Sequence, residues 1–148
     1  MYQHILIPTD GSALAGHAVT HGLSLAKIVG AKVSVIIVEA PFSVYEVPES
    51  KIRQMSEAFA QHAEQIRKHA TGVLTRAAEA ASAAGVPCNT SQVEHEHPYE
   101  AIIAAANNNR CDLIVMASHG RSGISAVLLG SVTNKVLTHT KTPVLVCR

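Results

Sequence analysis

Five short strand-like runs alternate with longer segments of helical periodicity, and this alternation constrains the fold of the chain more than any other feature. Because parallel neighbouring strands need a crossover connection, and such crossovers are right-handed, the pattern predicts an α/β protein. We expect one parallel sheet with helices on both of its faces. The predicted strands are residues 4–8, 33–38, 88–93, 113–116 and 143–147.

Helix boundary signals support this division of the chain. Ser12 is placed to cap the first helix, and Gly30 ends that helix in front of the second strand. A long Ala-rich segment over residues 50–84 predicts the second helix, and Pro98 suits the first position of the third helix. The polar character of strand 88–93 and the missing amide proton of Pro143 indicate that these two strands lie at the edges of the sheet.

Length and composition exclude several classes of protein. The 148 residues suit one domain, residues 1–148, and the hydrophobic fraction of 47% is too high for a disordered chain. No run approaches the roughly 18 apolar residues of a membrane span, so no membrane association is expected. A formal charge of +1 without a basic stripe argues against a nucleic-acid partner. The three cysteines are widely spaced and form no CxxC pair, which predicts buried, reduced thiols. The N-terminus lacks a signal-peptide pattern, which predicts a cytoplasmic protein.

A small-residue loop follows the fourth predicted strand. It contains Gly120 and, after nine further residues, Gly130-Ser131, and it leads into a helical pattern over residues 132–138. Such a loop lets backbone N–H groups approach a phosphate, and the following helix N-terminus adds positive potential. The alternative is a tight strand–helix connection that binds no ligand.

A second polar turn follows the first predicted strand, at residues 8–12. In an open parallel sheet, turns at the carboxyl ends of neighbouring strands face one crevice, where ligands bind. Asp10 supplies a hydrogen-bond acceptor there, and Ser131 and Thr133 supply hydroxyls at the helix N-terminus. Asp10 would alternatively serve only as a turn or helix-capping residue.

Four blocks of the sequence resemble the universal stress protein family. They are residues 5–12, 111–123, 128–133 and 142–146, in the family's order and spanning almost the whole chain. The resemblance implies a five-stranded doubly wound parallel sheet with strand order 3-2-1-4-5. It also implies a homodimer joined through the last strand and membership of the ATP-binding branch, with AMP or ADP as alternatives and with Mg²⁺ or Mn²⁺ on the phosphates.

The same resemblance assigns nucleotide contacts residue by residue. It places Pro8, Thr9 and Asp10 at the adenosine end, with Asp10 on the ribose hydroxyls. It places Val38 against adenine and Met116 and Ala117 on the floor of the site. It assigns the phosphates to Gly120, Gly130, Ser131, Val132 and Thr133.

The chain departs from the family pattern at two positions. Ala117 stands where the ATP-binding motif has its first glycine, and Glu96 stands where the family often has glycine near the third helix. If position 117 requires only close approach of the backbone, ATP binding survives. If the position requires a backbone conformation that only glycine adopts, binding weakens.

Nine histidines raise the question of a metal site. His17 and His21 lie four residues apart on the first helix, but they share their face with polar side chains, which favours a solvated stripe. The alternating Glu and His of residues 94–97 provide an incomplete ligand shell, so no metal site is predicted there. His119 flanks the glycine loop, where it either approaches a phosphate or bonds within the loop.

Three functions fit these observations. The first is a nucleotide-sensing dimer in stress response or signalling. The second is an enzyme with slow ATP hydrolysis; the chain lacks the P-loop, GxSxG and HExxH motifs, and no catalytic residue is marked. The third is an interaction dimer that binds no nucleotide. The glycine loop favours the first, and Ala117 favours the third.

Overall fold

The computed structural model describes residues 1–41, 48–121 and 128–148 of the chain. The strands are β1 (His4–Thr9), β2 (Lys32–Glu39), β3 (Cys88–Glu94), β4 (Leu113–Ala117) and β5 (Val144–Cys147). The helices are α1 (Ala13–Val29), α2 (Glu49–Ala84), α3 (Pro98–Asn108) and α4 (Ser131–His139). The strands form one sheet in the order β3-β2-β1-β4-β5, and every neighbouring pair is parallel. This confirms the predicted fold class and strand order.

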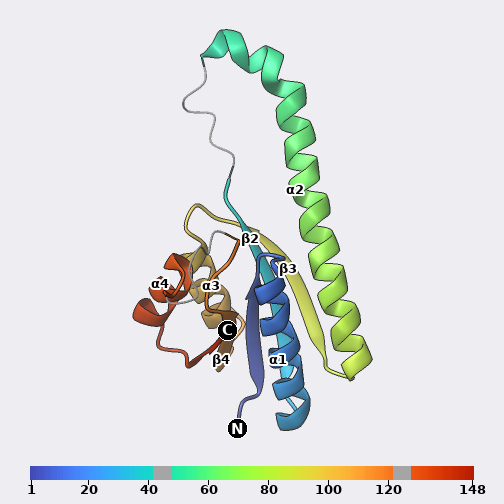
Figure 1. Ribbon diagram of the computed structural model, residues 1–148, viewed down its shortest axis with the longest axis vertical. Coiled ribbons are helices and arrows are strands. Elements are labelled where there is room, and N and C mark those ends of the chain that lie inside the picture. Colours follow the sequence, from blue (N-terminus) through green and yellow to red (C-terminus); the bar gives the residue numbers. More distant parts are fainter. Residues whose placement is uncertain (42–47, 122–127) are drawn as a thin grey trace.

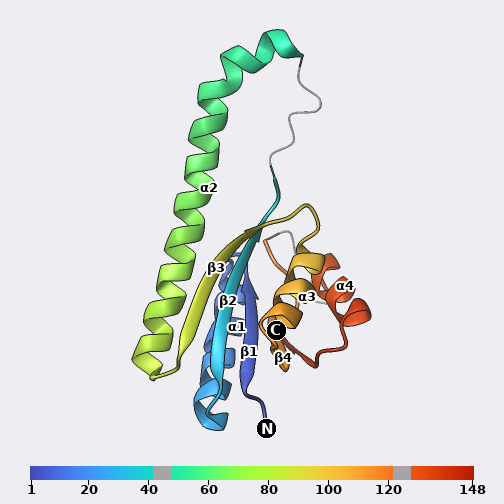
Figure 2. The ribbon, with the colours of Figure 1, turned by 180° about the vertical axis from the view of Figure 1, so that it is seen from behind.

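The helices cover both faces of the sheet, as expected. Helices α1 and α2 lie on one face and α3 and α4 on the other (Figures 1 and 2). Because side chains alternate along a strand, Ile5 and Ile7 enter the core cluster under α1 and α2, whereas Leu6 enters the cluster under α3 and α4. Strand β1 is buried along its whole length, so it anchors both layers.

The predicted boundary residues of α1 form the expected contacts. Ser12 caps the helix by accepting a 3.2 Å hydrogen bond from the backbone N–H of Ala15. Gly30 ends it in a left-handed conformation with φ of 72°, which glycine adopts without steric cost. These two caps fix the length of the crossover between β1 and β2.

Strands β3 and β5 lie at the two edges of the sheet, as the polar composition of the one and Pro143 before the other predict. Most side chains of β3 are exposed. In β5, Leu145 is 42% exposed, although it lies in the middle of the strand. An apolar side chain at an open sheet edge is a hazard for unwanted pairing unless another surface covers it.

Helix α2 is much longer than the sheet it packs on. Its 36 residues span about 54 Å, whereas the seven residues of neighbouring β3 span about 23 Å. Among its described residues, the fully buried ones begin at Ala70, and Figure 1 shows the earlier turns rising past the carboxyl ends of the strands. Helix α2 therefore passes beside the edge of the sheet formed by the carboxyl ends of the strands.

The three cysteines are free, as predicted. Cys111 and Cys147 are buried. The pKa of the Cys111 thiol is raised to about 11, mainly by burial and also by the Asp112 charge, while the Lys32 charge opposes the shift. Cys88 is only half-buried, because it begins an edge strand.

No helix in the described parts of the chain is both long and apolar enough to cross a bilayer.

Candidate functional site

A cavity of about 390 Å³ opens at the carboxyl ends of β1 and β4. At this point the chain order of the strands reverses, since β1 lies between β2 and β4, and open α/β sheets bind ligands at such a position. All the residues predicted for the site line this cavity: Pro8, Thr9, Asp10, Val38, Met116, Ala117, Gly120, Gly130, Ser131, Val132 and Thr133. The structure thus brings together segments from β1, β2, β4 and α4 that are far apart in the sequence.

Sequence reasoning assigned no contact to several other lining residues. They are Ala15, Glu39, Pro98, Ile102 and Arg121. His119, for which the sequence left two roles open, also lines the cavity. Pro98 and Ile102 come from α3, whose first turn faces the cavity. The sequence did place Arg121 directly after Gly120, which was a usable signal for its presence at the site.

The N-terminus of α4 opens into the cavity without a side-chain cap. Gly130 is its cap residue, and no side chain of Gly130 exists to bond the first-turn amides. The amide of Gly130 itself donates to the Ser118 carbonyl at 2.7 Å, which closes the loop. The amides of Ser131, Val132 and Thr133 occupy the first turn, where an α-helix offers them no internal acceptor. This end of α4 can therefore receive an anion.

Thr133 has a different role from the one predicted for its side chain. Its hydroxyl donates a 2.9 Å hydrogen bond to the Ala117 carbonyl, and the residue is 3% exposed. The hydroxyl proton is therefore used in the bond to the last residue of β4. Thr133 can still donate to a ligand through its backbone amide. The bond also holds α4 in place against the sheet.

The two glycines of the loop lie where a side chain would crowd its neighbours. A Cβ atom on Gly120 would collide with the Asp10 carboxylate. One on Gly130 would lie 3.0 Å from the Cα of His119 and 3.3 Å from the Ser118 carbonyl oxygen. A side chain at Gly120 would therefore displace the Asp10 carboxylate from its hydrogen bonds, and one at Gly130 would push the backbone at Ser118 and His119 apart by a few tenths of an ångström.

Ala117 does not occupy a backbone conformation reserved for glycine. It is the last residue of β4, and Arg110 is the one non-glycine residue in the described chain with a positive φ. Position 117 therefore has an ordinary strand backbone here, which favours the alternative that requires only close approach. The alanine methyl packs into the core under α1 and α2.

Asp10 is held in place by the turn that it begins. One carboxylate oxygen accepts from the Ser12 amide at 2.9 Å, and the other accepts from the Arg121 amide at 2.8 Å. Burial by itself would raise the pKa of Asp10. The hydrogen bonds from Ser12 and from the Arg121 amide, together with the Arg121 charge, outweigh burial and lower the pKa below its usual 3.8. A negative carboxylate therefore lies at the mouth of β1 at neutral pH.

Arg121 joins this turn to helix α2. Its Nε donates to the Asp10 carbonyl at 2.8 Å, and its Nη2 lies 2.8 Å from Nε2 of His69 on α2. A second guanidinium hydrogen bond, from Nη2, also reaches the Asp10 carbonyl. His69 was not predicted to lie near the site.

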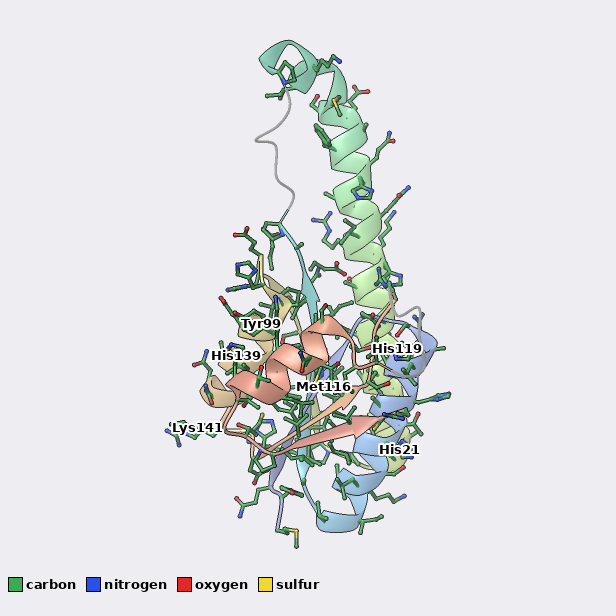
Figure 3. The ribbon with its side chains drawn as sticks, turned by 60° about the vertical axis from the view of Figure 1, so that its left-hand side comes forward. His21, Tyr99, Met116, His119, His139 and Lys141 are labelled. Atoms are coloured by element: carbon green, nitrogen blue, oxygen red, sulfur yellow. The ribbon has the colours of Figure 1, made fainter. Side chains whose placement is uncertain are left out.

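Among the other histidines, His119 lines the same cavity, whereas His17, His21 and His139 do not. His17 and His21 are exposed on α1. Nδ1 of His119 lies 3.1 Å from the Ser118 hydroxyl, so the side chain bonds within the loop while lining the cavity. His139 packs beside Tyr99 with ring centres 5.3 Å apart (Figure 3). Across residues 1–41, 48–121 and 128–148, no three potential metal-ligating side chains gather.

Comparison with known proteins gives a consistent result. The model of the universal stress protein family matches residues 1–148. Universal stress protein MJ0531 of Methanocaldococcus jannaschii is 31% identical over 149 residues, which cover 100% of this chain and 83% of that protein. The structure of hypothetical protein MJ0577 is similar with a TM-score of 0.80 and 27% identity, covering 99% of this chain and 96% of that one. A universal stress protein in complex with cAMP has a TM-score of 0.72 and 26% identity, covering 99% and 97%. With this fold, this strand order and a family match along its whole length, the chain belongs to the universal stress protein family.

Proposed function

We propose that residues 1–148 form one nucleotide-binding domain that holds ATP in the cavity between β1 and β4 and acts in stress response or signalling. The observation that carries the proposal is the uncapped N-terminus of α4, which lines the cavity beside Gly120 and Gly130. An anion-binding helix end at the switch point of an open sheet is suited to phosphates. The related protein with bound cAMP supports a nucleotide as the ligand.

Different groups of lining residues would hold the different parts of a nucleotide. The phosphates would lie at the first turn of α4, against the amides of Ser131, Val132 and Thr133. The ribose would lie near the Asp10 carboxylate, which can accept from its hydroxyls. The adenine would lie near Val38 at the end of β2, with Met116 and Ala117 below it.

A divalent cation would enter with the phosphates. Mg²⁺ keeps several waters and needs only one or two carboxylates besides phosphate oxygens. Asp10 and Glu39 are the carboxylates that line the cavity among the described residues. This donor set fits a phosphate-bound Mg²⁺ or Mn²⁺ and does not require a metal cage made by the protein alone.

The proposal includes a homodimer formed through β5. This strand is an open edge, and Leu145 is 42% exposed at its centre. Pairing β5 with the same strand of a second copy would satisfy its free backbone groups and cover this side chain. The proposal also includes the cytoplasmic location predicted from the sequence, with which three free cysteines agree.

A pair of glycine substitutions tests the site. Gly120→Ala places a methyl against the Asp10 carboxylate, whereas Gly16→Ala on α1 meets no atom within 4 Å. We expect Gly120→Ala to weaken MgATP binding at least tenfold in calorimetry and Gly16→Ala to bind as the parent does. Equal binding by all three proteins would place ATP elsewhere, and no binding by the folded parent would favour a nucleotide-free interaction dimer.

A further inference from the structure

The Arg121 guanidinium lies at the cavity but bonds only neutral groups. Its partners are the Asp10 carbonyl and the imidazole of His69. In the described part of the chain, no carboxylate lies within ion-pair distance of this guanidinium, and the Asp10 carboxylate accepts from the Arg121 amide instead. The Asp10 carboxylate is close enough for its charge to interact with Arg121, but it accepts from the Arg121 amide and not from the guanidinium. A phosphate in the cavity would therefore be a charged hydrogen-bond acceptor that the guanidinium lacks.

The hydrogen bond from Arg121 requires one protonation state of the His69 imidazole. A guanidinium can only donate, so Nε2 of His69 must accept, and its ring proton lies on Nδ1. The imidazole is therefore neutral in this contact. Protonated imidazole would have no acceptor to offer and would repel Arg121.

The contact lies where α2 reaches the turn after β1. A Cβ atom on Gly11 would meet Nε2 of His69 at 2.9 Å and a methyl of Val73 at 2.7 Å, so the turn and the helix are in close contact. His69 immediately precedes Ala70, the first fully buried described residue of α2. The Arg121–His69 bond therefore ties the segment after β4 to α2 at the start of the buried part of the helix. Figure 1 shows the earlier turns of α2 rising past the sheet.

We propose that Arg121 is a switch between His69 and a bound polyphosphate. This inference rests on the proposed nucleotide function. Hydrogen bonds from a guanidinium to phosphate are charge-assisted and often bidentate, and they are about twice as strong as bonds to neutral acceptors. A di- or triphosphate in the cavity would draw Arg121 away from His69. Nucleotide binding would therefore break a contact between the site and α2. A nucleoside without phosphates leaves the bond in place.

His69 then opposes binding, and Arg121 promotes it. His69→Ala removes the competing acceptor and should raise MgATP affinity about two- to tenfold. Arg121→Ala should lower it about tenfold or more. In the Arg121→Ala background, His69→Ala should change MgATP affinity less than twofold. His69→Ala should change adenosine affinity less than twofold, because adenosine carries no phosphate. Arg121→Ala also removes the guanidinium bonds to the Asp10 carbonyl, so it should lower adenosine affinity, but several-fold less than it lowers MgATP affinity.

The experiment is calorimetry of the full-length chain with MgATP and with adenosine. The controls are His17→Ala and Arg67→Ala, which remove an exposed histidine of α1 and an exposed arginine of α2. Circular dichroism confirms that each variant is folded. The imidazole ¹⁵N resonances of His69 give a second readout, which MgATP should shift and adenosine should not.

The outcomes separate the two proposals. If the parent binds MgATP and His69→Ala leaves the affinity unchanged or lowers it, the switch is wrong and the nucleotide site stands. The switch is also wrong if Arg121→Ala weakens MgATP and adenosine binding equally. If the folded parent binds neither ligand, the nucleotide function fails and the switch fails with it.

Discussion

The Thr133 hydroxyl donates a buried 2.9 Å hydrogen bond to the carbonyl oxygen of Ala117. This bond joins the first turn of α4 to the last residue of β4, so it sets the position of the helix end that lines the cavity. It uses a side chain that the sequence assigned to the phosphates. The stability of the site and its capacity to bind are thus linked through one residue.

Thr133→Val tests this link. The change keeps the shape of the side chain but leaves the buried Ala117 carbonyl without its donor, so we expect a loss of about 1–3 kcal/mol in the free energy of unfolding. MgATP affinity should fall as well, because the helix end loses its support. Thr138→Val is the matched control, since Thr138 is exposed on the same helix. Urea denaturation measures the stability, and equal losses in both variants would contradict the account.

Ala117→Gly tests the departure from the family motif. Glycine in a strand increases the entropy lost on folding, so we expect a loss of about 0.5–1 kcal/mol of stability. ATP affinity should stay the same or rise modestly, because the backbone at this position is already an ordinary strand. A large loss of affinity in calorimetry would mean that the alanine methyl packs against the ligand.

The fold could be predicted largely from the sequence because its signals are local. Alternating periodicity, Ser12, Gly30 and Pro143 each act within a few residues, and the observed strands agree with those predicted to within one or two residues. The order of the strands came from the family resemblance. Local pattern alone does not determine which strands lie beside each other.

The sequence predicted most of the residues that line the candidate site, but not all of the contacts that they make. Arg121 was visible next to Gly120, yet its partner His69 lies 52 residues away on another element. No local pattern indicates that contact, since it depends on how α2 packs beside β1. The direction of the Thr133 hydroxyl depends in the same way on the packing of α4 against β4.

His4 predicts a pH dependence of stability. Its Nδ1 donates to the Asn109 carbonyl, and its Nε2 accepts from the Ser34 hydroxyl at 2.8 Å. Burial, then the Lys32 charge, lower the pKa of His4 below its usual 6.5, although Asn109 and Asp112 oppose the shift. The unfolded chain therefore binds the proton more readily than the folded one. The stabilisation by neutral His4 is complete above about pH 6.5 and is lost as the pH falls through the lower folded pKa.

Two measurements check this pH dependence. An NMR titration should give His4 a pKa below 6.5, and the free energy of unfolding should decrease between pH 7 and pH 5. His4→Gln should make that decrease smaller. A His4 resonance that titrates at or above pH 6.5 would show that the burial effect has been assigned the wrong sign.

Leu145→Lys tests the proposed dimer. A lysine at the centre of β5 would place charges opposite each other across a two-fold interface, so we expect the variant to be monomeric at micromolar concentration. Ile28→Lys, on the exposed side of α1, is the control, since Ile28 is 82% exposed and lies outside β5. Light scattering measures the mass of each protein. A parent that is already monomeric at this concentration would refute the dimer.

A crystal structure of the chain with MgATP tests the central claim most directly. The account predicts the phosphates against the first turn of α4, beside Gly130, and the adenine near Val38. It also predicts one nucleotide for each chain. A nucleotide bound elsewhere on the molecule, or an empty cavity in crystals grown at saturating MgATP, would contradict it.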